Sequence, residues 1–343
     1  MVLEGGAGSV FAVTFHPDGK HFFDGTSNEI RRWRVADGQE LGKQTGMDVY
    51  SISVSKDQKW VACGTTTGAS VWDAELREKV AEVEGGKRVY VVDAAPDCTR
   101  FATGTKGQVI IWSITTGVKL LGPLKHGGSV RGVKFSPDGG RLATACYDDS
   151  TIRLFDAHNG DQLITIENAI TGDPLLPITW STHDQRLFAI STGHKIKSFD
   201  SSTGSPLAEW QIHDNDDGPM SIALSANGKF IASSAGRFVS FWDTSTHTQL
   251  GIVEETDDIV RSIAFSPDGC RFGTGSIDSG SSIIWDLRGI LPDTYLPGNV
   301  STPFLKSTTT FINEPFFLYT RKSLIPDCKY RTTLCPEWRI DSN

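Results

Sequence analysis

On length alone, 343 residues predict about two domains. A hydrophobic content of 38% and an aromatic content of 10% are sufficient for a packed core and exclude an intrinsically disordered chain. The formal net charge of −8 argues against a general nucleic-acid-binding protein, which needs a basic surface to neutralise phosphates.

The N-terminal segment MVLEGGAGSV lacks the charged and apolar regions of a signal peptide. No apolar run approaches the roughly 20 residues that a membrane-spanning helix needs. The six cysteines, at positions 63, 98, 146, 270, 328 and 335, form no C-x-x-C pair, so we expect reduced thiols and no disulfide framework or metal site. Together these features predict an intracellular protein, cytoplasmic or nuclear, without a membrane span or a cofactor.

A tight-turn motif recurs along the chain, and an aromatic residue follows each copy at a similar interval. The turn appears as HPDG at 16–19, SKDQ at 55–58, APDC at 95–98, SPDG at 136–139, STHD at 181–184, SANG at 225–228 and SPDG at 266–269. The aromatic residues are Trp33, Trp72, Trp112, Phe155, Phe199, Trp242 and Trp285. Their intervals of 39 to 44 residues indicate seven copies of one structural repeat.

Each copy predicts four short β-strands. In the fourth copy these are VRGVKF at 130–135, RLATAC at 141–146, TIRLF at 151–155 and the weaker DQLITI at 161–166, separated by turns. A four-stranded sheet with two apolar faces is not stable alone. Radial stacking of such sheets buries both faces, which predicts a β-propeller with the large aromatic residue of the third strand between neighbouring sheets.

Several copies end their third strand with Trp-Asp or Phe-Asp. These dipeptides are Trp72-Asp73, Trp242-Asp243, Trp285-Asp286, Phe155-Asp156 and Phe199-Asp200. With the turns and the repeat length, they make the chain resemble the WD-repeat β-propeller family over roughly residues 2–290, and its divergent fungal-type members in particular. The resemblance implies an all-β fold, a seven-bladed β-propeller of four-stranded antiparallel blades.

We therefore expect a WD-repeat β-propeller over 2–292 and a non-repeat tail over 293–343, for which the sequence allows either a poorly ordered extension or a segment that packs on the propeller or a partner. The blades are expected at approximately 10–46, 47–86, 87–127, 128–170, 174–215, 217–256 and 258–292. Propellers of this family usually close by completing the last blade with a strand from the other terminus. Val2–Glu4 is the predicted N-terminal closing strand, and Leu287–Leu296 is the alternative.

The resemblance also implies a buried hydrogen-bonded tetrad in each blade, made of a His, a Ser or Thr, a turn Asp and the Trp. The fourth copy keeps His126 and the turn residue Asp149, but its aromatic residue is Phe155. Gly6 and Thr256 stand at the His position in the first and seventh copies. No copy has the complete tetrad, and we predict structural roles for His126 and Asp149.

In the WD-repeat family, the start of each inner strand and the turn between the second and third strands line one face, called the top face. The aligned inner-strand position holds Phe11, Tyr50, Tyr90, Arg131, Leu176, Met220 and Arg261. Aromatic residues and arginine are enriched in interface hot spots. The predicted partner-binding surface comprises Phe11, Tyr50, Arg88, Tyr90, Arg131, Asp148, Met220 and Arg261. The alternative is that its aromatic side chains only pack over the central channel.

The sequence carries no P-loop, dinucleotide-binding, H-E-x-x-H or G-x-S-x-G motif. We therefore predict a non-catalytic scaffold that binds a protein or peptide partner, as a monomer or within a larger complex. One alternative is the sensor module of a larger multidomain protein. Another is a propeller hydrolase, which would need acidic or His residues in the central channel, where the aligned positions are aromatic, aliphatic or Arg.

Overall fold

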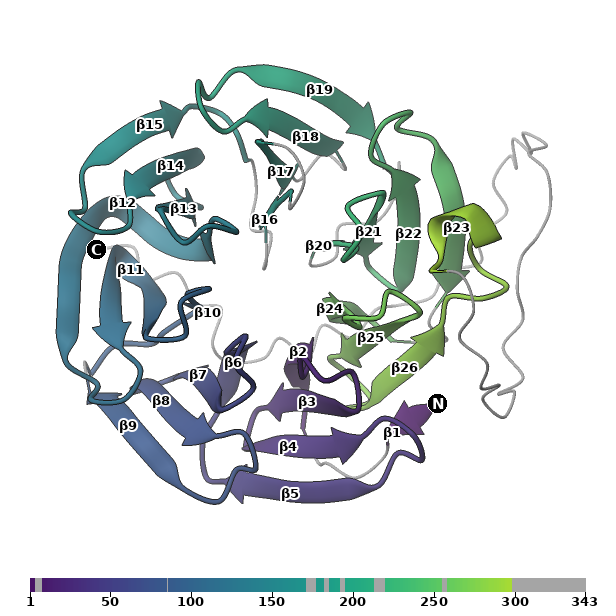
Figure 1. Cartoon of the computed structure of the whole chain (residues 1–343), viewed down its shortest axis with the longest axis horizontal. Helices are drawn as coiled ribbons and strands as arrows, with labels where there is room; N and C mark the ends of the chain where they lie inside the picture. The colour runs from purple at the N-terminus through teal and green to yellow at the C-terminus, as the bar shows by residue number, and fades with distance from the viewer. Residues whose placement is uncertain are drawn as a thin grey trace, which may run out of the picture. The chain divides into compact units, whose positions relative to one another are not determined.

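The computed structural model describes residues 1–3, 8–84, 86–170, 177–181, 185–191, 195–212, 220–254 and 258–297, all within the unit Met1–Phe311. In this unit, β-sheets surround a central axis, with their strands ordered from the axis to the perimeter (Figure 1). The only helix among the described residues is the short 3-10 helix η1 (Asp293–Tyr295), so the fold is an all-β propeller. No helix in this part of the chain is long and apolar enough to cross a membrane.

Four of the sheets contain four consecutive antiparallel strands that run from the axis outward (Figure 1). The first sheet comprises β2 (Val10–Phe15), β3 (His21–Thr26), β4 (Glu29–Arg34) and β5 (Glu40–Thr45). The second sheet comprises β6 (Val49–Val54), β7 (Trp60–Thr65), β8 (Gly68–Asp73) and β9 (Lys79–Glu84). A later sheet comprises β16 (Ile178–Trp180), β17 (Arg186–Ser191), β18 (Lys195–Asp200) and β19 (Pro206–Gln211). The next one comprises β20 (Met220–Leu224), β21 (Phe230–Ala235), β22 (Phe238–Asp243) and β23 (Gln249–Glu254).

Between them lies a six-stranded sheet. Its strands are β10 (Val91–Ala94), β11 (Arg100–Ser113), β12 (Lys119–Phe135), β13 (Arg141–Cys146), β14 (Thr151–Asp156) and β15 (Gln162–Ile166). β11 reverses direction near Gly107, which has a φ of +88°, and the Thr103 hydroxyl donates to the Ile110 carbonyl across this reversal. The first part of β12 pairs with β11 and its last part with β13. The described pairing therefore gives six sheets, and the predicted count of seven blades is not confirmed by it.

The last sheet joins the N-terminal strand to three strands from residues 260–286. It contains β24 (Val260–Phe265), β25 (Arg271–Ser276), β26 (Ser282–Asp286) and, at its outer edge, β1 (Val2–Leu3). Val2 pairs with Ile283, and the N-terminal ammonium of Met1 donates to the Ile284 carbonyl at 2.7 Å. The segment 287–296 takes a different path through η1, and Glu4 lies outside the described residues. The predicted tail is also outside them from residue 298 onward.

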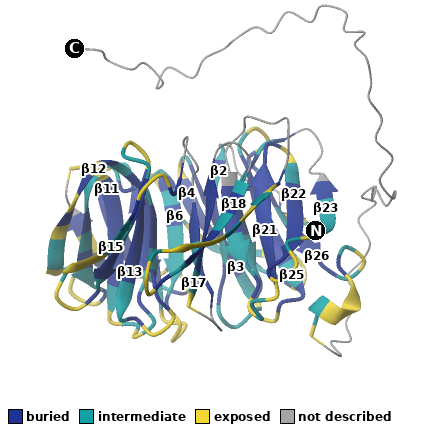
Figure 2. Ribbon diagram, turned by 90° about the horizontal axis from the view of Figure 1, so that it is seen from above, coloured by how far each residue is buried: buried dark blue, intermediate teal, exposed yellow. Residues whose placement is uncertain are grey.

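The core lies between neighbouring sheets. One cluster joins Leu3, Val10, Phe22, Trp33 and Ile284, which come from the first and last sheets. The repeat aromatic residues at the end of each third strand are buried, apart from a partly buried Trp112: Trp33, Trp72, Phe155, Phe199, Trp242 and Trp285. Exposed residues gather in the turns at both ends of the strands (Figure 2). The apolar faces of each sheet are thus covered by the next sheet, as a radial arrangement requires.

Candidate partner-binding surface at the top face

A β-bulge lies near the start of several innermost strands. The pairing of β2 with β3 skips Phe11, which is the extra residue between Val10 and Ala12. The equivalent irregularity in β6, β12 and β24 leaves out Tyr50, Arg131 and Arg261. A bulge redirects the side chain of its extra residue. The repeated bulge therefore presents an aromatic or arginine side chain at the same end of each of these sheets, the top face.

Three of these side chains, together with Arg88, form a continuous arc across neighbouring sheets. The rings of Phe11 and Tyr50 stack with their centroids 5.1 Å apart and their planes 8° from parallel. The guanidinium of Arg261 lies 4.3 Å from the Phe11 ring centroid, and that of Arg88 lies 4.8 Å from the Tyr50 centroid. We call Arg261, Phe11, Tyr50 and Arg88 the top-face arc. It links the last, first and second sheets and extends to the loop that precedes β10.

A second pair continues the pattern on the six-stranded sheet. The guanidinium of Arg131 lies 4.2 Å from the ring centroid of Tyr90, whose backbone N–H donates to Gly104. Each such cation–π contact contributes roughly 0.5–2 kcal/mol, depending on how much water it excludes. Tyr90, Arg131 and the members of the top-face arc are all half-buried. Their mutual contacts restrict their rotamers.

The other predicted residues of this surface are placed separately. Asp148 is exposed, and its carboxylate accepts a hydrogen bond from the backbone N–H of Ser129. A Cβ atom at Gly128 would lie 1.8 Å from this carboxylate, so glycine is required for the contact. Met220 begins β20 at the expected position, but its side chain and the whole of Leu176 lie outside the described residues.

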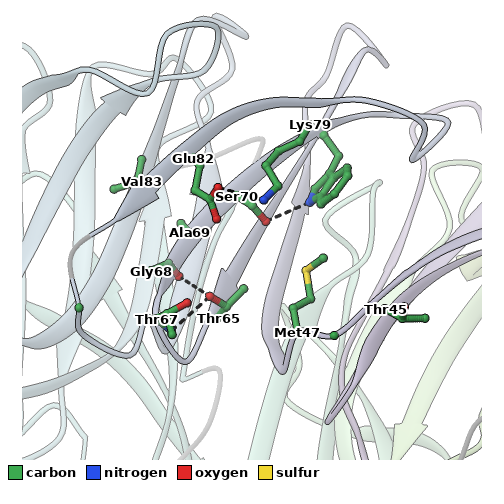
Figure 3. A pocket seen from close by; sticks show the side chains of 13 residues that line it. Thr45, Met47, Thr65, Thr67, Gly68, Ala69, Ser70, Lys79, Glu82 and Val83 are labelled. Atoms are coloured by element: carbon green, nitrogen blue, oxygen red, sulfur yellow. Dashed lines mark hydrogen bonds and ion pairs between the residues drawn. The ribbon is translucent and has the colours of Figure 1, made fainter.

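A cavity of about 540 Å³ opens between the first and second sheets (Figure 3). Its wall includes Met47, Trp72, Lys79, Glu82 and Val83. The indole Nε1 of Trp72 donates to the Ser70 hydroxyl at 3.0 Å, while the Lys79 ammonium lies over the indole ring and pairs with Glu82 at 2.9 Å. The wall also contains Thr65 and Gly68 of the β7–β8 turn, which lies at the same end of the sheet as Tyr50 because Val49 pairs with Thr65.

No sequence pattern indicates this cavity, because its walls come from several separate elements: the β5–β6 loop, the β7–β8 turn, β8 and β9. The repeat position of its most distinctive residue, Trp72, predicts a core residue. The structure supports both roles, because Trp72 is 7% exposed and packs in the core while one part of its ring faces the cavity.

Parts of the implied tetrad persist in three copies. The indole Nε1 groups of Trp112, Trp242 and Trp285 donate to Thr103, Ser233 and Thr274, respectively, at 2.9–3.1 Å. In the first copy the matching residue is Asp24, which binds Arg31 instead, and the Trp33 Nε1 has no partner among the described residues. The first copy has thus exchanged a neutral hydrogen bond for a buried ion pair.

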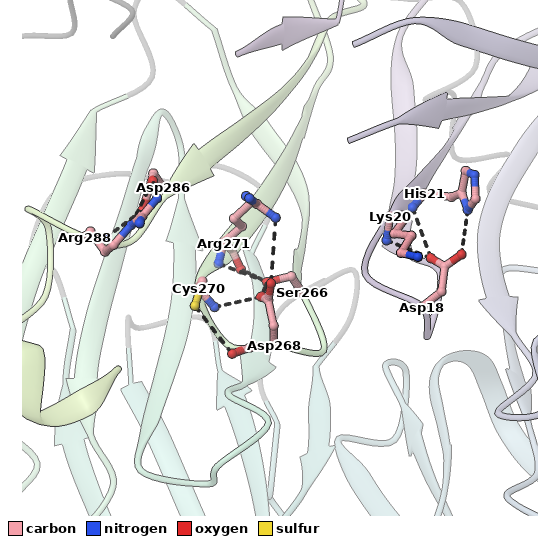
Figure 4. A network of polar contacts seen from close by, with 9 residues as sticks. All are labelled: Asp18, Lys20, His21, Ser266, Asp268, Cys270, Arg271, Asp286 and Arg288. Carbon is pink, nitrogen blue, oxygen red and sulfur yellow. Dashed lines mark hydrogen bonds and ion pairs between the residues drawn. The ribbon is translucent and has the colours of Figure 1, made fainter. Parts of the chain in front are cut away.

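The turn between the first and second strands lies at the opposite end of the sheets and is built on an aspartate. In the last sheet, Asp268 accepts from the Ser266 hydroxyl and the Cys270 N–H (Figure 4). In the first sheet, histidines replace the Ser and Arg partners. Asp18 accepts from the Lys20 N–H at 2.7 Å and from the His21 Nδ1 at 2.7 Å (Figure 4). Partial burial raises the pKa of Asp18, but hydrogen bonds from Lys20, His21 and His16 outweigh it and lower the pKa from 3.8 to about 2.

This lowered pKa predicts a pH-dependent effect of Asp18→Asn. A carboxyl group whose pKa falls on folding stabilises the protein above its unfolded pKa, and this contribution is lost as the pH falls through the folded value near 2. After allowance for solvent screening, we expect Asp18→Asn to lower the free energy of unfolding by about 1 kcal/mol at pH 7 and by much less at pH 2. Asn keeps the turn acceptor, as Asn227 does by accepting from the Lys229 N–H at 3.0 Å. Urea denaturation at both pH values measures this difference, and an equal loss at both would contradict it.

Comparison with known proteins gives the family. The family described as WD domain, G-beta repeat matches residues 119–156, 204–243 and 247–286, each ending at the aspartate that follows the repeat aromatic residue. The matched segments lie in the propeller described above. The chain belongs to the WD-repeat β-propeller family, whose members are generally non-catalytic and typically serve as protein-interaction scaffolds.

Similar proteins include the guanine nucleotide-binding protein subunit beta of Zea mays, 27% identical over 219 residues, which cover 59% of this chain and 56% of that protein. WD repeat-containing protein SL1-17 of Schistosoma mansoni is 32% identical over 143 residues, covering 40% and 46%. Protein HIR1 of Kluyveromyces lactis is 26% identical over 267 residues, covering 75% and 28%. The chain thus spans about half the length of the first two relatives. Because these relatives come from different kinds of organism, they do not narrow the family to fungal-type members.

Among solved structures, the β-propeller domain of Cps50 (Swd1) from Myceliophteria thermophila matches with a TM-score of 0.71 and 15% sequence identity. The match covers 83% of this chain and 98% of that one. At this identity the likeness establishes the propeller fold and no shared partner.

Proposed function

We propose that this chain is a non-catalytic scaffold that binds a protein or peptide partner on its top face. The observation that carries the proposal is the top-face arc, in which two aromatic rings are stacked on each other and flanked by two guanidinium groups. Large aromatic side chains and arginine supply most of the binding energy in many interfaces. An arc that is already assembled offers this chemistry without having to be ordered by the partner.

The alternative is that the aromatic side chains only pack over the channel. Aromatic residues that pack between the sheets are almost completely buried, as in the case of Phe22 and Phe101, both 0% exposed. Phe11, Tyr50 and Tyr90 are instead half-buried, although they occupy the innermost strands or the residue before one. Their incomplete burial favours a surface that a partner covers.

The cavity between the first and second sheets fits the same function. Its lining combines apolar side chains such as Met47 and Val83 with threonine hydroxyls and the Lys79–Glu82 pair, which fits a side chain that has both apolar and polar atoms. We propose that a partner lying on the top-face arc places such a side chain in this cavity.

We also infer that the propeller has seven blades over 2–292, with the six-stranded sheet forming two of them. In support, β12 pairs with β11 through its first part and with β13 through its last part, so it contains an outer and an inner strand. The inner segments also contact one another in a closed cycle: β2, β6, β10, β12, β16, β20, β24 and again β2.

The relatives suggest two cellular settings for such a scaffold. One relative is a subunit of a larger assembly by its name, which supports a role as a component of a complex within the cell, in the cytoplasm or nucleus. The match to HIR1 covers 75% of this chain but only 28% of that protein, which favours, as a second candidate, a binding module of a longer multidomain protein.

The test is a comparative pull-down from lysate with mass spectrometry. The bait is the wild-type chain, and the test variant is Phe11→Ala/Tyr50→Ala/Tyr90→Ala. Because hot-spot truncations cost about 2 kcal/mol each, we expect the specific partner to be lost from the variant. Its affinity, measured afterwards with the purified partner, should fall by at least about 30-fold.

The matched control is Leu120→Ala/Leu163→Ala/Leu207→Ala, which removes exposed apolar side chains from the perimeter strands β12, β15 and β19. This control should retain the partner. Circular dichroism and thermal unfolding must show that both variants are folded. An unchanged partner set in the top-face variant would show that the aromatic residues only pack, and would overturn the proposal.

A further inference from the structure

The fourth copy brings three potential metal ligands together. They are His126 on β12, Cys146 at the end of β13 and Asp149 in the turn that follows. One ligand atom from each of them lies within 4.8 Å of the other two. The cluster is largely closed to solvent, because Cys146 is 0% and His126 is 9% exposed, while the Asp149 side chain is 25% exposed and forms its outer side.

His126 is unpaired in this cluster. Neither of its ring nitrogens has a hydrogen-bond partner among the described residues, although both atoms are buried. The closest aromatic neighbour, Phe155, packs edge-on at a centroid distance of 5.8 Å and offers no polar atom. A buried polar group without a partner costs free energy, so this imidazole needs an explanation.

The turn aspartate Asp149, which the tetrad implied by the family would pair with this histidine, forms its hydrogen bonds with other residues. Asp149 accepts from the Thr151 hydroxyl through Oδ1 and from the Arg153 guanidinium through Oδ2, each at 2.7 Å, and it also accepts a hydrogen bond from the Cys146 thiol. A carboxylate oxygen has two lone pairs, so Oδ2 keeps one that Arg153 does not use. The cluster therefore offers an imidazole nitrogen, a thiol sulfur and a carboxylate oxygen for one further atom between them.

We propose that His126, Cys146 and Asp149 bind one divalent transition-metal ion of the zinc class. Nitrogen, sulfur and oxygen donors at tetrahedral positions are the ligand set that Zn²⁺ and Co²⁺ prefer in proteins. The thiol releases its proton on binding, so the thiolate and the Asp149 carboxylate place two negative charges beside the dication. The Arg153 guanidinium, which is paired with Asp149, leaves the site with one net positive charge. Water takes the fourth position, on the side where Asp149 is exposed.

The other copies show that this donor set is particular to the fourth one. The residue equivalent to Cys146 is an alcohol or alanine elsewhere: Thr26, Thr65, Thr105, Ser191, Ala235 and Ser276. Thr65, for example, donates to the carbonyl of Gly68 in its own turn at 3.0 Å. In the other His-containing cluster, His16, Asp18 and His21 are joined by hydrogen bonds, and no ring nitrogen of this cluster is among the buried described atoms that lack a partner. The proposal does not depend on partner binding at the top face.

The test is a titration of the full-length, chelator-treated and reduced protein with Co²⁺, followed by optical absorption. A cobalt ion bound by a cysteine thiolate gives a thiolate-to-cobalt charge-transfer band, which nitrogen and oxygen ligands alone do not produce. We expect this band to saturate at one equivalent of Co²⁺ and to disappear when Zn²⁺ displaces the cobalt. Zn²⁺ should also raise the midpoint of thermal unfolding, because it binds the native state.

Cys146→Ser is the decisive variant, since it restores a residue type found at the same position in two other copies and should fold. We expect it to lose the charge-transfer band and to bind Zn²⁺ at least tenfold more weakly. His126→Gln should also weaken Zn²⁺ binding at least tenfold. Two matched controls, Cys63→Ser at another buried thiol and His21→Gln in the other histidine cluster, should behave as wild type. A wild-type protein without the band, or a band that survives in Cys146→Ser, would overturn the proposal.

Discussion

Replacement of Arg31 by Ile is expected to lower the free energy of unfolding by about 3–5 kcal/mol, because it leaves an uncompensated charge in the core. The Nε and Nη2 groups of Arg31 each donate to one carboxylate oxygen of Asp24 at 2.8 Å, and both side chains are 0% exposed. After the substitution, Asp24 keeps the Ser282 hydroxyl of the last sheet, at 2.7 Å, as a donor. One neutral hydrogen bond cannot replace a bidentate cation.

The double variant Asp24→Thr/Arg31→Ile should recover most of this loss. It recreates the combination in the last sheet, where Thr274 pairs with Ile283 and accepts from the Trp285 Nε1 at 3.1 Å. Trp33, whose Nε1 has no partner among the described residues, would gain the same bond. Urea denaturation of the wild type, both single variants and the double variant measures the coupling as a double-mutant cycle.

Arg34→Ile is the matched control. Arg34 lies on the same strand as Arg31 but forms an exposed ion pair with Asp37. Its loss should cost no more than about 1 kcal/mol. If Arg31→Ile were as mild as this control, the ion pair would not be a main determinant of stability in the first sheet.

The second large effect is expected for Phe272→Ala, at about 3–5 kcal/mol. Phe272 is 1% exposed and stacks on Trp285 with a centroid distance of 5.7 Å and an interplanar angle of 9°. It also meets Phe241 of the preceding sheet edge-to-face at 5.1 Å. Truncation therefore opens a cavity in the interface between two sheets, where backbone pairing on both sides limits collapse.

Phe272→Leu should cost less than half as much, since Leu142 and Leu187 occupy the equivalent position in other copies. Denaturant unfolding compares both variants with Leu163→Ala, which truncates a side chain that is 48% exposed and should be nearly neutral. Similar losses for Phe272→Ala and Leu163→Ala would mean that the interface repacks around the missing ring.

The sequence was sufficient to predict which residues make up the candidate surface. It did not predict which of these residues contact one another. Alignment of the repeats placed Phe11, Tyr50 and Arg261 at one position, and the structure brings them together through bulges at that position. The stacking of Phe11 on Tyr50 joins two sheets and depends on the distance between them. The cavity beside Trp72 was not predicted for the same reason. The binding role of this surface stays a prediction.

The arginines around Trp33 illustrate how tertiary structure assigns opposite roles to adjacent residues. As a sequence, Arg31 to Arg34 is a dense basic cluster. In the structure, Arg31 points inward to Asp24 and Arg34 outward to Asp37. Alternation along a strand determines that the two side chains lie on different sides, but only the packing of the neighbouring sheet decides how deeply each one is buried.

The sequence by itself determined the repeat, the succession of short strands and turns within it and the propeller class, because turn chemistry and alternation act over a few residues and recur in every copy. Tertiary structure alone decided which side chains meet between sheets: the top-face arc, the buried ion pair that reaches Ser282, and the unpaired His126 beside Cys146. The top-face arc and the contact of the ion pair with Ser282 join residues some forty or more positions apart. His126 is unpaired because the Asp149 carboxylate accepts its hydrogen bonds from other residues. Such outcomes are set by the closed ring of sheets and by competition within the core, and local sequence patterns carry no information about either.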